Sequence, residues 1–425
     1  MQTSELKHRT SCRLCKNKRL KTIYDLRSTP IGDDYVKNSA KKQKKHPLKL
    51  NICTNCKFIQ LSHIVNTNIV YGNYLYSTQT SYGLPKHFEN LVKNLFLKKI
   101  INKESKVLEI GSNDGTLLNF ISSYGCEVLG VDPARELARN TPFKTINNFF
   151  TYKLSKKIKK DYGAYDLIIA NNVIANIDDL DTTFEGIAYL LKSNGFFVIE
   201  TFSLKGIVKE NLIDNIYHEH LSYFTTETLI KFAKKFNLHI FSTEHLSVKG
   251  GSIRLVFSKR EDLDWFKYVK GNLYNKDEEK NKKLFNKNIK VEEKLKLGSI
   301  KTYSKLKNKN NITKSKIQKF VKSEILKGKE FAGYGASIGT TTLLHEYDLG
   351  NSIKYLFDNE KKRHNLYSPG YKIKVLHPKK IKKIKPHYII IFAWRYAKTI
   401  LKKNKKYFNK NVKFILPHPK FKILK

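Results

Sequence analysis

The stretch Val107-Leu-Glu-Ile-Gly-Ser-Asn-Asp-Gly-Thr-Leu-Leu118 determines the fold that we expect for the middle of this chain. Its apolar start predicts a short strand over 106–110, and the apolar run after the turn predicts a helix. Gly111 and Gly115 in the turn let a ligand lie against the backbone, where the first amides of the helix are unpaired. Asp114 would repel a phosphate, so this turn favours a ligand with a positive centre and an amino acid tail.

A second predicted strand, Glu127-Val-Leu-Gly-Val-Asp132, ends in an acidic residue. At roughly 20 residues after a glycine turn, such a carboxylate can bind the paired hydroxyls of a ribose. Together with Glu109 and the glycine turn, this pattern resembles the S-adenosylmethionine (SAM) signature of class I methyltransferases. A dehydrogenase-like turn is the alternative, but the third glycine of the dinucleotide-binding fingerprint is missing.

Predicted strands and helices alternate over residues 106–259, and the clearest strands cover 107–110, 127–131, 167–170 and 196–200. This alternation predicts an α/β fold with a parallel sheet and helices on both faces. A second strand, glycine-rich turn and helix begin at Glu330, so we expect another α/β unit near the C-terminus. Its turn contains Gly333, Gly335 and Gly339, and it either binds a nucleotide or only turns tightly.

Four of the five cysteines form two C-x-x-C pairs, Cys12 with Cys15 and Cys53 with Cys56. In a chain whose start lacks the apolar core of a signal peptide, this pattern indicates a metal site rather than disulfides. Four thiolates suit a closed, tetrahedral zinc site with a structural role. Cys126 stands alone before a predicted strand, and we expect it to be an ordinary core cysteine.

The chain carries 81 Lys and Arg against 37 Asp and Glu, a formal net charge of +44. Such a charge can indicate nucleic-acid binding, but only ten of the basic residues are arginine and the lysines are spread along the chain. Dispersed lysine is typical of a solvated surface, so we expect no specific nucleic-acid partner. No run of 18 apolar residues is present, and we expect a cytoplasmic protein without a membrane-spanning helix.

The segment Tyr217-His-Glu-His220 follows the fourth strand of the predicted central sheet, and ligands of such sheets bind at the carboxyl ends of the strands. If the methyl acceptor is a carbon, a base must first remove its proton, and histidine suits that task. His, Glu and Tyr together could supply a base, an orienting carboxylate and a donor to an oxyanion. A polar turn with a His–Glu hydrogen bond is the alternative, and the H-E-x-H spacing is not that of a zinc protease.

With these motifs in order, nearly the whole chain resembles the sugar C-methyltransferase family that makes branched-chain deoxysugars. The resemblance is carried by the two C-x-x-C pairs and by three segments: Glu109–Gly115, Tyr217-His-Glu-His-Leu-Ser-Tyr-Phe224 and Gly333-Tyr-Gly-Ala-Ser337. It implies a small zinc-binding domain over 1–70, a class I (Rossmann-like) SAM domain over 71–260, a helical linker over 261–328 and a Rossmann-like α/β domain over 329–425.

The resemblance also implies the substrate, a nucleotide-linked 4-keto sugar, and a reaction in which a base removes the C-3 proton and the enolate attacks the SAM methyl group. His220 is then the base, Tyr217 and Glu219 position the sugar or stabilise the enolate, and Tyr76 enters the active site. For SAM, the resemblance implies that Gly111, Asn113 and Asp114 line the amino acid tail, that Asp132 holds the ribose, and that Asn171 and Asn172 close the pocket.

Two positions depart from the family pattern. Asn176 stands where several members carry histidine, and Gly339 stands where some carry lysine. Both departures bear on the substrate more than on the reaction class. Three other functions are left open: a SAM-dependent O- or N-methyltransferase of another small molecule, a nucleic-acid-binding protein, and an inactive SAM-binding scaffold. The presence of Tyr217, Glu219 and His220 argues against the scaffold.

Overall fold

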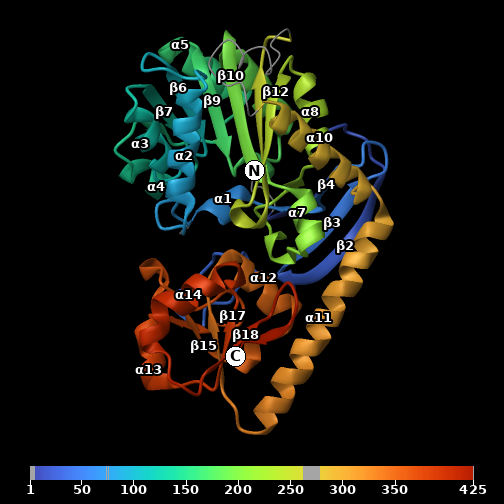
Figure 1. Cartoon of the computed structure of the whole chain (residues 1–425), viewed down its shortest axis with the longest axis vertical. Helices are drawn as coiled ribbons and strands as arrows, with labels where there is room; N and C mark the ends of the chain where they lie inside the picture. Colours follow the sequence, from blue (N-terminus) through green and yellow to red (C-terminus); the bar gives the residue numbers. More distant parts are fainter. Residues whose placement is uncertain (1–4, 73, 75, 262–277, 425) are drawn as a thin grey trace.

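The computed structural model describes residues 5–72, 74, 76–261 and 278–424, with side chains described from residue 286 onward after the second gap. Residues 262–277 of the expected helical linker lie outside this description. Within the described residues, no helix is both long enough and apolar enough to cross a membrane. Figure 1 shows an upper body built on a central sheet, a lower body, and the long helix α11 running beside both.

The central sheet has seven strands in the order β12-β13-β10-β9-β6-β7-β8. Their bounds are Lys106–Ile110 (β6), Glu127–Val131 (β7), Thr145–Ile146 (β8), Tyr165–Asn171 (β9), Leu191–Phe202 (β10), His239–Leu246 (β12) and Ser252–Ser258 (β13). The first five in chain order are parallel to one another, and β13 is antiparallel to both β10 and β12. The predicted parallel sheet is confirmed, and it ends in an antiparallel pair.

Alternate residues of the inner strands pack into different cores, as expected for a sheet covered on both faces. In β6, Val107 belongs to a cluster with helices α2 and α3, whereas Leu108 belongs to a larger cluster with helix α6. The helices of this body are Leu84–Leu97 (α2), Thr116–Ser122 (α3), Arg135–Asn140 (α4), Tyr152–Tyr162 (α5), Leu180–Leu190 (α6), Leu204–Glu210 (α7) and Thr226–Lys234 (α8). Cys126 is buried in the first cluster, as predicted.

The N-terminal segment forms an antiparallel sheet in the order β11-β4-β3-β2, beside a small pair of β1 (Leu6–His8) and β5 (His63–Val65). Three strands of the four-stranded sheet come from the N-terminal segment: Leu20–Thr29 (β2), His46–Cys53 (β3) and Ile59–Leu61 (β4). The edge strand β11 is Ser222–Tyr223, which begins two residues after His220 and pairs with Gln60 and Ile59. The N-terminal sheet therefore holds one end of that segment.

The C-terminal body contains a second sheet in the order β16-β15-β14-β17-β18-β19. The strands are Phe331–Tyr334 (β14), Ile353–Phe357 (β15), Lys374–Leu376 (β16), Tyr388–Ile391 (β17), Lys413–Leu416 (β18) and Lys422–Leu424 (β19), the last antiparallel to its neighbour. Along the chain, helices α10 (Glu278–Lys294) and α11 (Ile300–Leu326) precede the strands of this sheet. Helices α12 (Ile338–Glu346), α13 (Ile381–Ile384) and α14 (Ala397–Asn404) connect its strands. Helix α11 buries Tyr303, Leu306, Ile317 and Val321. The second predicted α/β unit is confirmed.

Candidate active site and zinc site

One cavity of about 350 Å³ lies at the carboxyl ends of strands β6, β7, β9 and β10. Ten residues that the sequence indicated line its wall: Tyr76, Glu109, Gly111, Asn113, Asp132, Asn171, Asn172, Tyr217, Glu219 and His220. The wall also includes Asn176, one of the two departures from the family pattern, and Ile338 of the C-terminal body. The candidate cofactor-binding and catalytic residues therefore share one cavity, apart from Asp114.

Backbone amides hold the carboxylate of Asp132 in place. The amide of Asn113 donates to one carboxylate oxygen at 2.8 Å, and the amide of Ala134 donates to the other at 2.8 Å. Gly111 has φ +76°, and a Cβ there would lie 2.9 Å from the side chain of Val173. Each oxygen of Asp132 retains a lone pair that could accept a hydroxyl. This geometry fits a ribose at the end of β7.

Four polar side chains of the wall have buried atoms without a hydrogen-bond partner among the described residues. These atoms are the hydroxyl oxygen of Tyr76, Oε2 of Glu109, both Oδ1 and Nδ2 of Asn171, and Oδ1 of Asn176. Burial, together with the charges of Asp132 and Asp114, raises the pKa of Glu109 well above its usual value. Buried polar groups are normally satisfied, so unpaired ones beside a cavity point to a polar ligand. The residues present therefore fit SAM.

Asp114 lies beside this wall rather than in it, because its carboxylate is occupied by the chain itself. One oxygen accepts from the hydroxyl of Ser77 at 2.6 Å and from the amide of Gln79 at 2.9 Å. The other oxygen accepts from the amide and hydroxyl of Thr116 at the start of α3. Asp114 thus joins the segment next to Tyr76 to the glycine turn, and its implied contact with the amino acid tail stays a prediction.

The ring of His220 is held at both nitrogens. Nδ1 lies 2.7 Å from the carbonyl oxygen of Asn215, and Nε2 lies 2.7 Å from the hydroxyl of Tyr217. Because a carbonyl oxygen can only accept, Nδ1 carries the proton and Nε2 is the basic nitrogen of the neutral ring. Burial lowers the pKa of His220 to about 3, which keeps the ring neutral before substrate binds. The alternative interpretation of this segment was a polar turn with a His–Glu hydrogen bond. The partners of the His220 ring are instead Asn215 and Tyr217.

The other residues of the Tyr217–His220 segment face different surroundings. Burial, with a contribution from Asp33, raises the pKa of Glu219 to about 8, so its carboxyl group is mostly protonated at neutral pH. His218 instead lies against the N-terminal sheet, where its Nε2 is 3.3 Å from the carbonyl oxygen of His46. Tyr217, Glu219 and His220 therefore supply three hydrogen-bonding groups to the cavity, and His218 supplies none.

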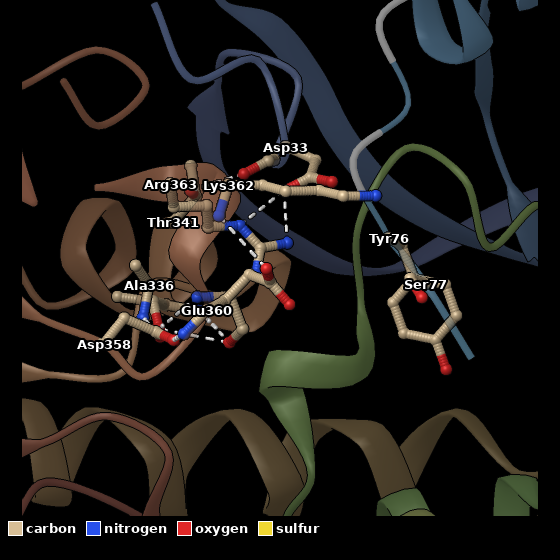
Figure 2. A network of polar contacts seen from close by, with 12 residues as sticks. Asp33, Tyr76, Ser77, Ala336, Thr341, Asp358, Glu360, Lys362 and Arg363 are labelled. Carbon is tan, nitrogen blue, oxygen red and sulfur yellow. Dashed lines mark hydrogen bonds and ion pairs between the residues drawn. The ribbon is translucent and has the colours of Figure 1, made fainter. Parts of the chain in front are cut away.

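The C-terminal glycine-rich turn is packed tightly against neighbouring backbone. Gly335 has φ +101°, and a Cβ at Gly339 would lie 2.9 Å from the carbonyl oxygen of Asp214. Figure 2 shows Asp358 directed at the amide of Ala336, which donates to it at 2.5 Å. These contacts favour the interpretation that the turn serves close packing. Nearby, Arg363 reaches across to Asp33 at 2.7 Å and joins the C-terminal body to the N-terminal segment.

The four cysteines of the C-x-x-C pairs come together in the N-terminal segment. Sγ of Cys12 lies 3.5 Å from that of Cys56, Sγ of Cys15 lies 3.6 Å from that of Cys53, and all four sulfur atoms lie within 4.8 Å of one another. Zinc–sulfur bonds of about 2.3 Å in a tetrahedron place sulfur atoms about 3.8 Å apart. The spacing therefore fits a structural zinc ion bound by four thiolates.

The chain matches three protein families in order along its length. Residues 12–71 match a "Putative zinc binding domain", residues 84–243 a methyltransferase domain, and residues 247–419 a C-methyltransferase C-terminal domain. C-methyltransferase NovU of Streptomyces niveus is 27% identical over 420 residues, which cover 97% of this chain and 96% of the relative. By these matches the chain is a C-methyltransferase. It is a SAM-dependent enzyme with a zinc-binding domain.

Three further similarities of this C-methyltransferase each cover part of the chain. A ubiquinone biosynthesis O-methyltransferase of Pelagibacter ubique is 27% identical over 120 residues, 27% of this chain and 50% of that protein. The crystal structure of the PH0226 protein of Pyrococcus horikoshii covers 44% of this chain and 95% of its own, with 18% identity and a TM-score of 0.34. A SAM-dependent methyltransferase of Clostridium acetobutylicum covers 45% and 94%, with 13% identity and a TM-score of 0.32.

Several residues of the C-methyltransferase cavity were not predicted from the sequence. Lys249 and Asp178 line the wall, but each stands outside any motif. Asn215 lies two residues before Tyr217, so only its position beside the motif could have indicated it. Tyr71 lies in the aromatic stretch that contains Tyr76, and that stretch could have indicated it as a second wall residue.

Proposed function

We propose that this C-methyltransferase methylates a carbon next to the ketone of a nucleotide-linked keto-deoxysugar, with His220 as the base. One observation carries the proposal: a neutral imidazole, with its proton on Nδ1, presents Nε2 to the cavity that also contains the candidate SAM residues. Methylation of carbon needs a base for the C–H proton, and a neutral histidine can accept it. The keto-sugar class rests on the resemblance carried by the Tyr217–Phe224 segment.

SAM, when bound, supplies a methyl group on a positively charged sulfur, which needs no further activation. Asp132 would hold its ribose hydroxyls, and the unpaired atoms of Glu109 and Asn171 are available for its other polar groups. The chain then has to place the acceptor carbon in line with that methyl group. Placement of this kind contributes strongly to the rate when two reactants are held in one cavity.

In the proposed reaction, Nε2 of His220 takes the proton from the carbon next to the ketone. The electron pair of that C–H bond moves to the ketone oxygen and forms an enolate. The hydroxyl of Tyr217 leaves Nε2 when substrate binds, and together with the protonated carboxyl group of Glu219 it donates hydrogen bonds to the enolate oxygen. Donors fixed in advance around a developing oxyanion lower the barrier. The enolate carbon would then be the nucleophile that accepts the methyl group of bound SAM, with S-adenosylhomocysteine as the leaving group.

Deuterium wash-in tests the base and the substrate class together. The protein, with S-adenosylhomocysteine in place of SAM, is incubated in heavy water with a panel of nucleotide-linked 4-keto-6-deoxysugars, which are then analysed by mass spectrometry. We expect exchange above the protein-free rate with at least one sugar, loss of exchange in His220→Ala, and retention of exchange in His239→Ala, a histidine outside the cavity. Absence of exchange in a protein that binds S-adenosylhomocysteine would overturn the proposal and favour methylation of oxygen or nitrogen.

A further inference from the structure

The segment between α7 and β11, which carries the base, is held by the C-terminal body. The side-chain Nδ2 of Asn211 donates to the carbonyl oxygen of Pro419 at 3.2 Å. The hydroxyl of Thr342 donates to the carbonyl oxygen of Ile216 at 3.2 Å. A third and more extensive contact joins Asp214 to residues that follow β17. The C-terminal body thus contacts this segment immediately before the Tyr217–His220 motif.

Asp214 is 3% exposed and accepts three hydrogen bonds from two adjacent side chains. The guanidinium group of Arg395 donates to both of its oxygens, at 2.7 and 3.0 Å, and the indole nitrogen of Trp394 donates at 3.0 Å. Burial alone would raise the pKa of Asp214, but the charge of Arg395 and the hydrogen bonds keep it below its usual value. Asp214 is therefore a buried carboxylate whose orientation is set by a two-pronged partner.

Arg395 is itself confined on both sides. Its guanidinium carbon lies 4.5 Å from the centre of the Trp394 ring, and a Cβ at Gly250 would lie 2.8 Å from its Nε. The guanidinium group also donates to the side-chain oxygen of Asn215 at 3.3 Å. One residue of the C-terminal body thus contacts both Asp214 and Asn215, and the backbone carbonyl of Asn215 is the partner of Nδ1 of His220.

We propose that Arg395 is a positioning residue for the base: through Asp214 and Asn215 it holds the carbonyl group that fixes the tautomer and direction of the His220 ring. This inference rests on the proposed role of His220. Without the Asn215 carbonyl at hydrogen-bond distance, the ring proton could occupy either nitrogen, and the tautomer with the proton on Nε2 could not accept the substrate proton. A lysine at position 395 would keep the charge but would lose the two-pronged geometry.

The tautomer of His220 can be measured without substrate. Protein labelled with ¹⁵N and ¹³C in its histidine rings is examined by NMR at neutral pH, and the His220 signals are assigned from their loss in His220→Ala. We expect the wild-type ring to carry its proton on Nδ1 alone. Arg395→Ala should show averaged nitrogen signals of two tautomers, and Arg395→Lys should lie between these. Arg27→Ala, which removes an Arg–Asp contact to Asp348 elsewhere between the N-terminal and C-terminal bodies, should match the wild type.

A purely structural role for Arg395 predicts a different result. If Arg395→Ala, and likewise Arg395→Gln, retains a single Nδ1-protonated ring, the inference is overturned whatever the variants do to stability. If these variants fail to fold, Arg395→Lys takes their place, and its His220 ring signals show whether the tautomer depends on residue 395. With a sugar that the wild type exchanges in the deuterium wash-in, we expect Arg395→Ala to slow the exchange about tenfold. Its affinity for S-adenosylhomocysteine should match that of the wild type. Absence of wash-in by the wild type would contradict the proposed function but leave the tautomer result standing.

Discussion

Nε of Arg13 lies 3.0 Å from Oδ1 of Asp178, and this contact joins the zinc site to the wall of the active-site cavity. Arg13 stands between two of the cysteine ligands, Cys12 and Cys15, and its side chain is fully buried. It also donates to the carbonyl oxygen of Leu61 at 3.1 Å. The position of this arginine depends on the conformation of the C-x-x-C turn, which the metal ion stabilises.

Removal of zinc should therefore weaken binding of the cofactor as well as the fold. Chelation should lower the thermal unfolding temperature, because binding of a structural zinc ion contributes folding free energy. It should also lower the affinity for S-adenosylhomocysteine, measured by calorimetry, because Asp178 loses its partner Arg13. Metal-free protein with unchanged affinity would contradict this coupling between zinc and the cavity.

Arg13→Ala tests the same coupling with the zinc ligands intact. We expect a loss of about 1–3 kcal/mol in the free energy of unfolding, because the carbonyl oxygen of Leu61 becomes an unpaired buried acceptor. Arg9→Ala is the matched control, since Arg9 also contacts Asp178 but is partly exposed. Urea unfolding of both variants, with zinc content measured in parallel, checks the prediction. Equal losses in the two variants would contradict it.

His220→Ala and Asp132→Ala should separate catalysis from cofactor binding. Loss of the base should lower the rate of methyl transfer by about 10²–10⁴-fold while the affinity for S-adenosylhomocysteine stays close to that of the wild type. Loss of the Asp132 carboxylate should instead weaken cofactor binding by about 1.5–3 kcal/mol, the contribution of hydrogen bonds to a charged group. Calorimetry and single-turnover rates measure the two effects. Equal loss of cofactor affinity in both variants would contradict this division of roles.

Tyr217→Phe should reduce activity without a large effect on the fold. The hydroxyl of Tyr217 lies 2.7 Å from Nε2 of His220, and in the proposed reaction it donates to the enolate oxygen. Removal of one such donor lowers the rate by about 10²–10³-fold. Tyr189→Phe, on the exposed side of α6, is the control. A Tyr217→Phe enzyme with the wild-type rate would exclude this hydroxyl as a donor in the reaction.

Glu219 should make both stability and activity depend on pH. Burial raises the pKa of Glu219 to about 8, above that of the unfolded chain, so the folded protein holds its proton more tightly. Its contribution to stability is therefore complete below the usual carboxyl pKa and is lost as pH rises toward 8, by at most about 1.4 kcal/mol per pH unit. Activity should fall only as pH rises through about 8, where the carboxyl group ionises in the folded protein and no longer donates to the enolate.

Glu219→Gln keeps a donor but cannot ionise. Its stability and activity should lack the pH dependence attributed to Glu219, as measured by urea unfolding and initial rates across the window. Glu227→Gln, an exposed position on α8, should follow the wild-type profile. If Glu219→Gln and the wild type show parallel profiles, the carboxyl group does not titrate in this range.

Local sequence patterns were sufficient to predict much of the fold. The strand at 106–110, the helix after the glycine turn and the second α/β unit all match the structure, because each depends on apolar periodicity and turn residues within a few positions. Strand β11 could not be predicted in the same way. Its two residues carry no periodicity, and they form a strand only because the edge of β4 lies beside them.

The sequence by itself determined which chemical groups the protein has: four thiolates in two C-x-x-C turns, the acidic glycine turn at 109–115, and the Tyr217–His220 segment. These motifs are local, so their residue types and spacing already specify what they can bind or accept. Tertiary structure alone decided which of those groups are in contact and which of them are protonated. The contacts Arg13–Asp178 and Arg395–Asp214 join residues 165 and 181 positions apart, and the proton on Glu219 depends on burial by several segments. Such contacts arise only when the whole chain has packed, because burial and ion pairing depend on distance in space rather than distance in sequence.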